Sequence, residues 1–302
     1  MYGSYISSTY NGNKLNSLPI LLKKFGYTSA FFHGGNNGTM GFDSFTRMAG
    51  FDNYIGRNEY KGNEYDGTWG IYDEPFFKFY CDEMSKMKQP FVTSFFSLTS
   101  HHPYKIPEQH ENSFGKNLTP MMKSIRYADY ALQQFFQSAS TQDWFNNTLF
   151  VITADHTGPI LTSKYKTRTG IYSIPIIFYD AGNNLRGMDS TTTQQTDIVP
   201  SVLDYIHYPD AFKFYGQSVF DSLHSGYAVN FLSGTYQLIT KEHVVNYDGE
   251  KTIGFYNRSD DSDFKNNLAA VSSAAKDSLV LKLKLIVVDY NFSMIHNKLT
   301  QP

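Results

Sequence analysis

The chain has 302 residues, a formal net charge of −2 and a hydrophobic share of 41%. This length suits one large α/β domain or one domain with an appendage, and the composition is that of an ordinary globular protein. The near-neutral charge, without any basic cluster, excludes an electrostatic case for binding nucleic acid. The single cysteine, Cys81, excludes an internal disulfide and a cysteine-ligated metal site. Residues 1–17 are polar and read as a loop or arm, not as a signal peptide.

Helices and strands are predicted to alternate in the first half of the chain. Ser17 and Pro19 indicate a helix start, because serine is a favoured N-cap and proline is tolerated in the first turn. Apolar spacing and turn residues predict helices over 18–25, 42–48, 73–87 and 121–138, and strands over 27–32, 90–98 and 149–154. The run over 149–154 lacks polar alternation, which is typical of a strand buried on both faces of a parallel sheet.

The second half changes from α/β alternation to antiparallel hairpins. The predicted elements are a strand over 172–179, a helix over 196–205, short strands over 227–232, 236–240, 243–247 and 251–256, and a helix over 263–299. This order predicts an α/β class protein: an α/β/α sandwich with a mostly parallel sheet, plus a smaller C-terminal antiparallel β region and a terminal helix. We expect residues 1–225 to form the α/β domain and residues 226–302 to pack on it.

Three predicted strands run directly into histidines. His33 follows the first strand, His101 and His102 follow the second, and Asp155 with His156 follow the third. If these strands are parallel neighbours, all three loops open on the same edge of the sheet. Asp155 and His156 offer one oxygen and one imidazole nitrogen, a mixed set that suits a divalent metal. Each histidine alone is as well explained as a buried or surface residue, but together the three strand ends favour a shared site.

A glycine-rich loop over 34–38 follows His33 directly. It is not a nucleotide-binding P-loop, since no Lys-Ser/Thr pair follows it. It fits a flexible turn and a backbone nest for an anion equally well. A reaction on a phosphate or sulfate ester needs a metal, and imidazoles or cations around the non-bridging oxygens. The strand ends supply candidates for both.

Five motifs in this chain resemble, in order, those of the sulfatase-like enzymes of the alkaline phosphatase superfamily. The motifs are residues 31–35 (FFHGG), 69–70 (WG), 98–104 (LTSHHPY), 153–156 (TADH) and 197–203 (DIVPSVL). The resemblance is strongest to the lipoteichoic acid synthase-like branch, especially its Gram-negative form, and covers roughly residues 15–300. It implies an alkaline phosphatase-like sandwich in which Asp155 and His156 are metal ligands. It also implies that His33 and His101 line the substrate pocket, with His102 in place of an aromatic residue.

The same resemblance implies a metal-dependent hydrolase or transferase that acts on phosphate or sulfate esters. Manganese is the first choice of metal, with zinc, magnesium or calcium as alternatives. The implied substrate is an anionic ester of a lipid head group, such as phosphoglycerol or phosphoethanolamine, or of a sulfated glycan. The implied location of the full-length protein is extracytoplasmic, in the periplasm or on the outer face of a bacterial inner membrane. The membrane would be reached only through an N-terminal segment that this chain lacks.

Two departures from the family pattern qualify this expectation. The family's opening strand with its acidic ligand, and the nucleophile after it, have no counterpart here, so we expect an N-terminally incomplete domain without a catalytic nucleophile. Lipoteichoic acid synthases also carry a Trp and an Arg just past the His-Gly loop. This chain has Gly41 and Asp43 near those places, with Arg47 as a distant substitute, so specificity for glycerol phosphate is not implied.

These departures lead to two expectations for the chain as it stands, and to two alternatives to an enzyme. With part of the ligand set missing, metal should bind weakly and the chain should be inactive or nearly so. A missing sheet strand would leave an exposed edge and favour self-association. The alternatives to an enzyme portion are a non-catalytic binding module for an anionic glycan or lipid head group, and a structural remnant without a ligand.

Overall fold

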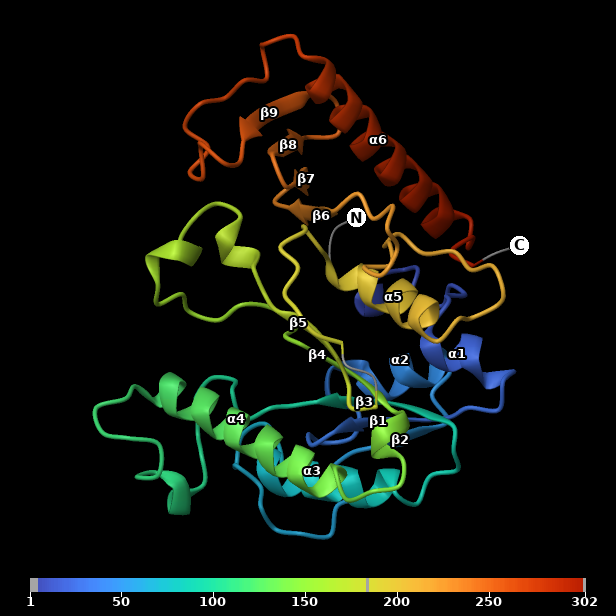
Figure 1. Cartoon of the computed structure of the whole chain (residues 1–302), viewed down its shortest axis with the longest axis vertical. Helices are drawn as coiled ribbons and strands as arrows, with labels where there is room; N and C mark the ends of the chain where they lie inside the picture. The colour runs from blue at the N-terminus through green and yellow to red at the C-terminus, as the bar shows by residue number, and fades with distance from the viewer. Residues whose placement is uncertain (1–4, 183–184, 301–302) are drawn as a thin grey trace. The chain divides into compact units, whose positions relative to one another are not determined.

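A computed structural model describes residues 5–182 and 185–300 of the chain (Figure 1). The chain divides into two compact units. The first, the 17–148 unit, is Ser17–Thr148; the second, the 149–302 unit, comprises Met1–Asn16 and Leu149–Pro302. Among the described residues, no helix combines the length and the apolar character needed to cross a bilayer. The predicted division at residues 225 and 226 stays a prediction.

The 17–148 unit is built as three layers around a parallel sheet. Strand β1 (Thr28–His33) lies between β2 (Asn53–Ile55) and β3 (Phe91–Phe96), parallel to both. The α-helices are α1 (Leu18–Lys23), α2 (Phe42–Met48), α3 (Asp73–Met84) and α4 (Pro120–Ala139). Figure 1 shows α1 and α2 on one side of the sheet and α3 with α4 on the other. This unit has the layering that the sequence predicts.

Successive side chains of β1 alternate between the two faces of the sheet and pack into the core on each face. Phe32 is fully buried, and its ring packs edge-on against Tyr80 of α3 with centroids 4.7 Å apart. Phe31 points the other way and packs near Phe42 of α2, at 6.4 Å. Because successive side chains of a strand face opposite sides, this one strand anchors helices on both faces. Phe32 alone contributes about 1.5–3 kcal/mol by its burial.

In this unit the sequence predicts the start of α1 better than the end of α3. Ser17 caps α1 as predicted, its Oγ accepting a hydrogen bond from the Ile20 N–H at 3.2 Å. Within α4, Tyr127 is fully buried, whereas Ile125 is 52% exposed. α3 ends at Met84, one turn before the predicted residue 87.

The 149–302 unit contains the predicted antiparallel sheet and terminal helix. Its strands and α-helices are β4 (Leu149–Thr153), β5 (Ile176–Asp180), α5 (Ile198–Tyr205), β6 (Tyr227–Leu232), β7 (Thr235–Thr240), β8 (His243–Tyr247), β9 (Thr252–Asn257) and α6 (Ala274–Ile295). Strands β6 to β9 pair antiparallel in chain order, and α6 lies along this sheet (Figure 1). Leu283 of α6, Leu238 and Val245 are fully buried together between helix and sheet. This packing confirms the C-terminal antiparallel region and its helix.

Two sequence expectations are wrong in this unit. Among the described strands, β4 pairs only with β5, and the pair is antiparallel; the strand is half-buried instead of buried on both faces. An apolar run signals a strand but not the direction of its partner. The last helix begins at Ala274, not at residue 263. Asp261 accepts the N–H groups of Lys265 and Asn266 at 2.8 and 2.7 Å, and such local bonds compete with a helix.

Candidate functional site

The carboxyl ends of β1 and β3 bring three of the predicted motifs together. His33 at the end of β1 is in register with Phe96 at the end of β3, so the loops that follow open on the same edge of the sheet. The loop after His33 then bridges to the Trp-Gly segment, with Gly35 paired to Gly70 and the Ile71 N–H donating to the Gly34 carbonyl at 3.0 Å. This edge, formed by residues 33–38, 65–71 and 98–104, is called the rim below.

Two glycines are required where these segments meet. A Cβ on Gly35 would lie 2.6 Å from Cε1 of His33 and 3.2 Å from the Trp69 carbonyl oxygen. A Cβ on Gly70 would lie 2.5 Å from the Gly34 carbonyl oxygen. Such distances are below van der Waals contact, so only glycine permits this approach of backbone to backbone and ring.

His33 is a buried, neutral imidazole. It is 2% exposed, its Nδ1 lies 2.9 Å from the Tyr54 hydroxyl, and its ring packs between Phe42 and Phe96 with centroids 5.0 and 5.7 Å away. Burial lowers the pKa of His33 to about 4, because the charged form loses its hydration. At neutral pH this residue can exchange hydrogen bonds with a ligand but supplies no positive charge.

The stability of the protein should therefore rise with pH as the unfolded form of His33 loses its proton. Its pKa is about 4 when folded and near 6.5 when unfolded. The stability linked to it is complete above pH ~6.5 and lost as pH falls toward 4, by about 3 kcal/mol. Urea denaturation of the wild type and of His33→Gln between pH 4 and 7 measures this, because other titrating groups cancel in the difference. Parallel curves for the two proteins would disprove the assignment.

His101 is held by a tryptophan and by a carbonyl of its own loop. The His102 carbonyl oxygen accepts hydrogen bonds from the Trp69 indole N–H at 2.6 Å and from Nδ1 of His101 at 2.8 Å. The rings of Trp69 and His101 meet edge to face, with centroids 4.3 Å apart. With its proton on Nδ1, neutral His101 keeps a lone pair on Nε2. The ring of His102 packs near Tyr104 instead, at 5.7 Å, so His102 organises the loop through its backbone.

Asp73 fixes the start of the His101 loop, a role that the sequence does not reveal. Its carboxylate is 1% exposed and accepts the backbone N–H groups of Leu98 at 2.9 Å and Thr99 at 3.3 Å. In return, the Asp73 N–H donates to the Thr99 hydroxyl at 2.9 Å. Burial raises the pKa of Asp73 to about 6. From the sequence alone, the favourable position of an acid at a helix N-terminus already accounts for Asp73. The sequence gives no sign of its distant backbone partners.

Asp155 and His156 lie in the 149–302 unit, directly after β4. The His156 N–H donates to Oδ1 of Asp155 at 2.8 Å, and Nε2 of the ring lies 3.3 Å from Oδ2. Nδ1 of His156 lies 2.8 Å from the Thr157 carbonyl oxygen. Both side chains are more than half exposed, at 54% for Asp155 and 71% for His156. The pair is thus accessible, with its nitrogen and oxygen side by side.

This pair fits two adjacent positions around one divalent cation. If Nδ1–H donates to the Thr157 carbonyl, Nε2 carries the lone pair that a metal needs. Two donors bound ~2.1 Å from one zinc ion at tetrahedral angles lie about 3.4 Å apart, close to the observed 3.3 Å between Nε2 and Oδ2. Over residues 5–182 and 185–300, no group of three or more His, Cys, Asp or Glu side chains is placed to hold a metal. The described residues therefore offer a partial ligand set.

Gln195, two residues before the fifth motif, supports the loop that carries this pair. Gln195, just before α5, donates its side-chain N–H groups to the carbonyl oxygens of Ala154 and Asp155 at 2.9 and 3.0 Å. Asp197 is 2% exposed, and its carboxylate accepts backbone N–H groups from Gln194 and Gln217 at 2.9 and 2.8 Å. Asp197, the first residue of the fifth motif, is thus explained by its structural hydrogen bonds.

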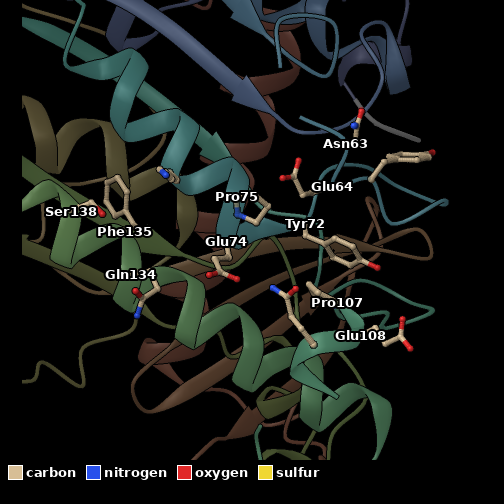
Figure 2. A pocket seen from close by; sticks show the side chains of 13 residues that line it. Asn63, Glu64, Tyr72, Glu74, Pro75, Pro107, Glu108, Gln134, Phe135 and Ser138 are labelled. Carbon is tan, nitrogen blue, oxygen red and sulfur yellow. The ribbon is translucent and has the colours of Figure 1, made fainter. Parts of the chain in front are cut away.

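A pocket of about 640 Å³, which shares Tyr65 with the rim, lies in the 17–148 unit (Figure 2). Its lining residues are Asn63, Glu64, Tyr65, Tyr72, Glu74, Pro75, Lys78, Pro107, Glu108, Gln109, Gln134, Phe135 and Ser138. Three carboxylates and one lysine give this lining a negative balance, and Glu74 is already bound to His110 at 3.1 Å. Because like charges repel, this pocket disfavours an anionic ester. The rim is the better candidate for an anion.

Solved structures identify the class of fold. A protein of the alkaline phosphatase superfamily from Vibrio parahaemolyticus aligns with 99% of this chain and 73% of its own length, with a TM-score of 0.85 and 21% identity. The lipoteichoic acid synthase LtaP from Listeria monocytogenes aligns with 96% of this chain and 76% of its own, with a TM-score of 0.76 and 21% identity. These likenesses confirm the alkaline phosphatase-like α/β fold.

Sequence comparison then gives the family. The Sulfatase family model matches residues 1–208, so the chain belongs to the Sulfatase family. Lipoteichoic acid synthase 1 of Bacillus subtilis is 27% identical over 249 residues, covering 76% of this chain and 38% of the relative. Lipoteichoic acid synthase of Staphylococcus aureus is 24% identical with the same coverage. The resemblance to the lipoteichoic acid synthase-like branch is confirmed, and the chain spans about two fifths of these relatives' length.

Proposed function

We propose that this chain is the part of a metal-dependent, sulfatase-like hydrolase or transferase that binds an anionic phosphate or sulfate ester. The observation that carries this proposal is the rim, where three family motifs converge at the carboxyl ends of β1 and β3 and place His33 and His101 on one edge. Open α/β sheets bind their ligands at this position. Membership of the Sulfatase family supports the reaction class.

The two rim histidines have different tasks in this proposal. If the Tyr54 hydroxyl donates to Nδ1 of His33, the proton of the neutral ring is on Nε2 and can be donated to an oxyanion oxygen. His101 has the opposite tautomer, with Nδ1–H on the His102 carbonyl, and its Nε2 can accept a proton from an alcohol. His33 then contacts the anion, His101 contacts the alcohol or leaving group, and His102 fixes the loop.

Asp155 and His156 hold a divalent metal in this proposal, manganese first, with zinc, magnesium or calcium as alternatives. A bound metal would neutralise charge on the ester oxygens during transfer. We assign no catalytic nucleophile to this chain, and two donors are a partial ligand set. We therefore propose weak metal binding and negligible turnover by the chain alone, in an extracytoplasmic protein that acts on a lipid head group or a glycan. Self-association remains part of this proposal.

A second candidate is a binding module without catalysis, for an anionic glycan or lipid head group. The observation that favours it is that every residue of the rim comes from the 17–148 unit. Such a module would bind its ligand without a metal. The two candidates thus differ in whether anion binding depends on manganese.

Calorimetry with glycerol 1-phosphate and sulfate, with and without Mn²⁺, tests the proposal. We expect saturable anion binding that Mn²⁺ strengthens, and turnover of a chromogenic phosphodiester or sulfate ester at the background rate. An anion affinity that is the same with and without Mn²⁺, and the same in His156→Ala, would favour the second candidate. Turnover well above the background rate would overturn the proposed inactivity. A chain that binds neither anion under either condition would refute both candidates.

A further inference from the structure

Arg57 is a cation placed directly beside the glycine loop of the rim. Its backbone N–H donates to the Gly35 carbonyl at 3.1 Å, and its Nη1 donates to Oδ1 of Asn36 at 2.9 Å. The guanidinium carbon lies 3.7 Å from the centroid of the Tyr65 ring. Stacking on an aromatic face and one side-chain hydrogen bond fix the plane of this guanidinium before any ligand arrives.

The guanidinium has donors left for a ligand. Arginine carries five N–H donors, and the bond to Asn36 is the one hydrogen bond of this side chain within the described residues. Glu59, two residues further on, does not pair with it. The Glu59 carboxylate instead accepts the Gly56 N–H at 2.7 Å and the Asn37 amide at 3.1 Å. Arg57 is therefore a half-buried cation without an acidic partner among the described residues.

Tyr65 joins Arg57 to the tryptophan segment of the rim. Tyr65 forms a bridge with Ile71, and its hydroxyl donates to the Thr68 carbonyl at 3.3 Å. Gly35, which accepts the Arg57 N–H, bridges to Gly70 and packs against the ring of His33. The arginine thus shares its immediate neighbours with both His33 and Trp69. Arg47, the cation that the sequence suggests, is exposed at the last turn of α2.

We propose that Arg57 is a specificity-determining residue that binds the phosphate or sulfate oxyanion of the substrate. The inference rests on the proposed function and adds a pre-oriented guanidinium to that site. His33 is neutral at pH 7, so it cannot attract an anion by charge. A planar guanidinium can present two parallel N–H groups to two oxygens of one oxyanion, which is the strongest common form of such a contact.

Lys105, the residue directly after the last rim segment, provides the matched control. Its ammonium group already donates to the Asp66 carbonyl at 3.3 Å and to the Thr68 hydroxyl at 3.1 Å. An ammonium group also has no fork of parallel donors. Removing Lys105 therefore removes the same unit of charge as removing Arg57, without removing the pre-oriented donors. Comparing the two variants separates recognition by oriented hydrogen bonds from a general attraction of anions to positive charge.

The test is calorimetric titration of the full chain with glycerol 1-phosphate, inorganic phosphate and sulfate, at one fixed Mn²⁺ concentration. R57Q should lower the affinity for all three ligands about tenfold or more, whereas K105Q should change these affinities less than about threefold. R57K keeps the charge but not the fork, and should fall between R57Q and the wild type. Circular dichroism of each variant verifies folding, and R57K supplies the comparison if R57Q does not fold.

Three results would overturn the assignment of Arg57. One is wild-type affinity in R57Q, or in a folded R57K when R57Q does not fold. Another is an equal loss in R57Q and K105Q, which would reveal a general charge effect. In both cases the proposed function would stand, because the wild type still binds the oxyanion. A wild type that binds none of the three ligands would refute the proposed function together with the role of Arg57.

Discussion

Replacing Asp73 with alanine is expected to lower the free energy of unfolding by about 3–5 kcal/mol. The carboxylate is almost fully buried and accepts the N–H groups of Leu98 and Thr99. Alanine would leave both donors without their partner inside the protein, and each unsatisfied group costs about 1–3 kcal/mol. Urea denaturation at pH 7 measures the loss. The matched control is Asp82→Ala, which removes an exposed acid of the same helix and should change stability by less than about 0.5 kcal/mol.

Asp73 is a positioning residue, and a second measurement separates this role from general stability. Asp73→Asn keeps one acceptor oxygen and should fold, but it cannot accept both N–H groups in the same way. We expect anion affinity to fall in folded Asp73→Asn, because the loop that carries His101 begins at Leu98 and Thr99. Unchanged anion affinity in this variant would restrict Asp73 to a structural role. An Asp73→Ala loss as small as that of Asp82→Ala would refute the energetic account.

Replacing His156 with alanine is expected to weaken manganese binding about 100-fold. The ring nitrogen Nε2 lies 3.3 Å from Oδ2 of Asp155, so the pair offers two adjacent donors, and alanine removes one of them. Loss of a residue that merely orients a ligand already costs 10- to 100-fold in affinity. Electron paramagnetic resonance of free Mn²⁺ in a titration measures the change. Asp155→Asn should show a comparable loss.

His296→Ala is the control for this prediction. His296 is an exposed histidine of the same unit, and its ring contacts Phe292 with centroids 4.4 Å apart. Its removal should leave manganese affinity unchanged. If His156→Ala and His296→Ala bind Mn²⁺ as tightly as the wild type, the pair is not the metal site.

The sequence predicts those features that local chemistry controls. The Ser17 cap, the strand that ends at His33 and the C-terminal hairpins were accessible because capping, periodicity and turn signals act over a few residues. Placement of His33 and His101 on one edge followed from the expectation that β1 and β3 are parallel, which the structure confirms. The expectation that Asp155 and His156 join that edge stays a prediction.

Long-range partners were not accessible from the sequence. Arg57 and Asp73 owe their roles to contacts with Tyr65, Asn36, Leu98 and Thr99, and no periodicity reports which backbone group an acid or a cation will reach. The prediction that β4 belongs to a parallel sheet is wrong for the same reason. Strand propensity does not encode which strand will be the partner, and β4 pairs antiparallel with β5.

The most direct test of the metal-dependent account is anomalous diffraction from crystals grown with Mn²⁺ and phosphate. The account expects a manganese peak within coordination distance of both a carboxylate oxygen of Asp155 and Nε2 of His156. It also expects a phosphate within hydrogen-bond distance of the His33 ring. A manganese peak on other residues, with Asp155 and His156 free of metal, would contradict it.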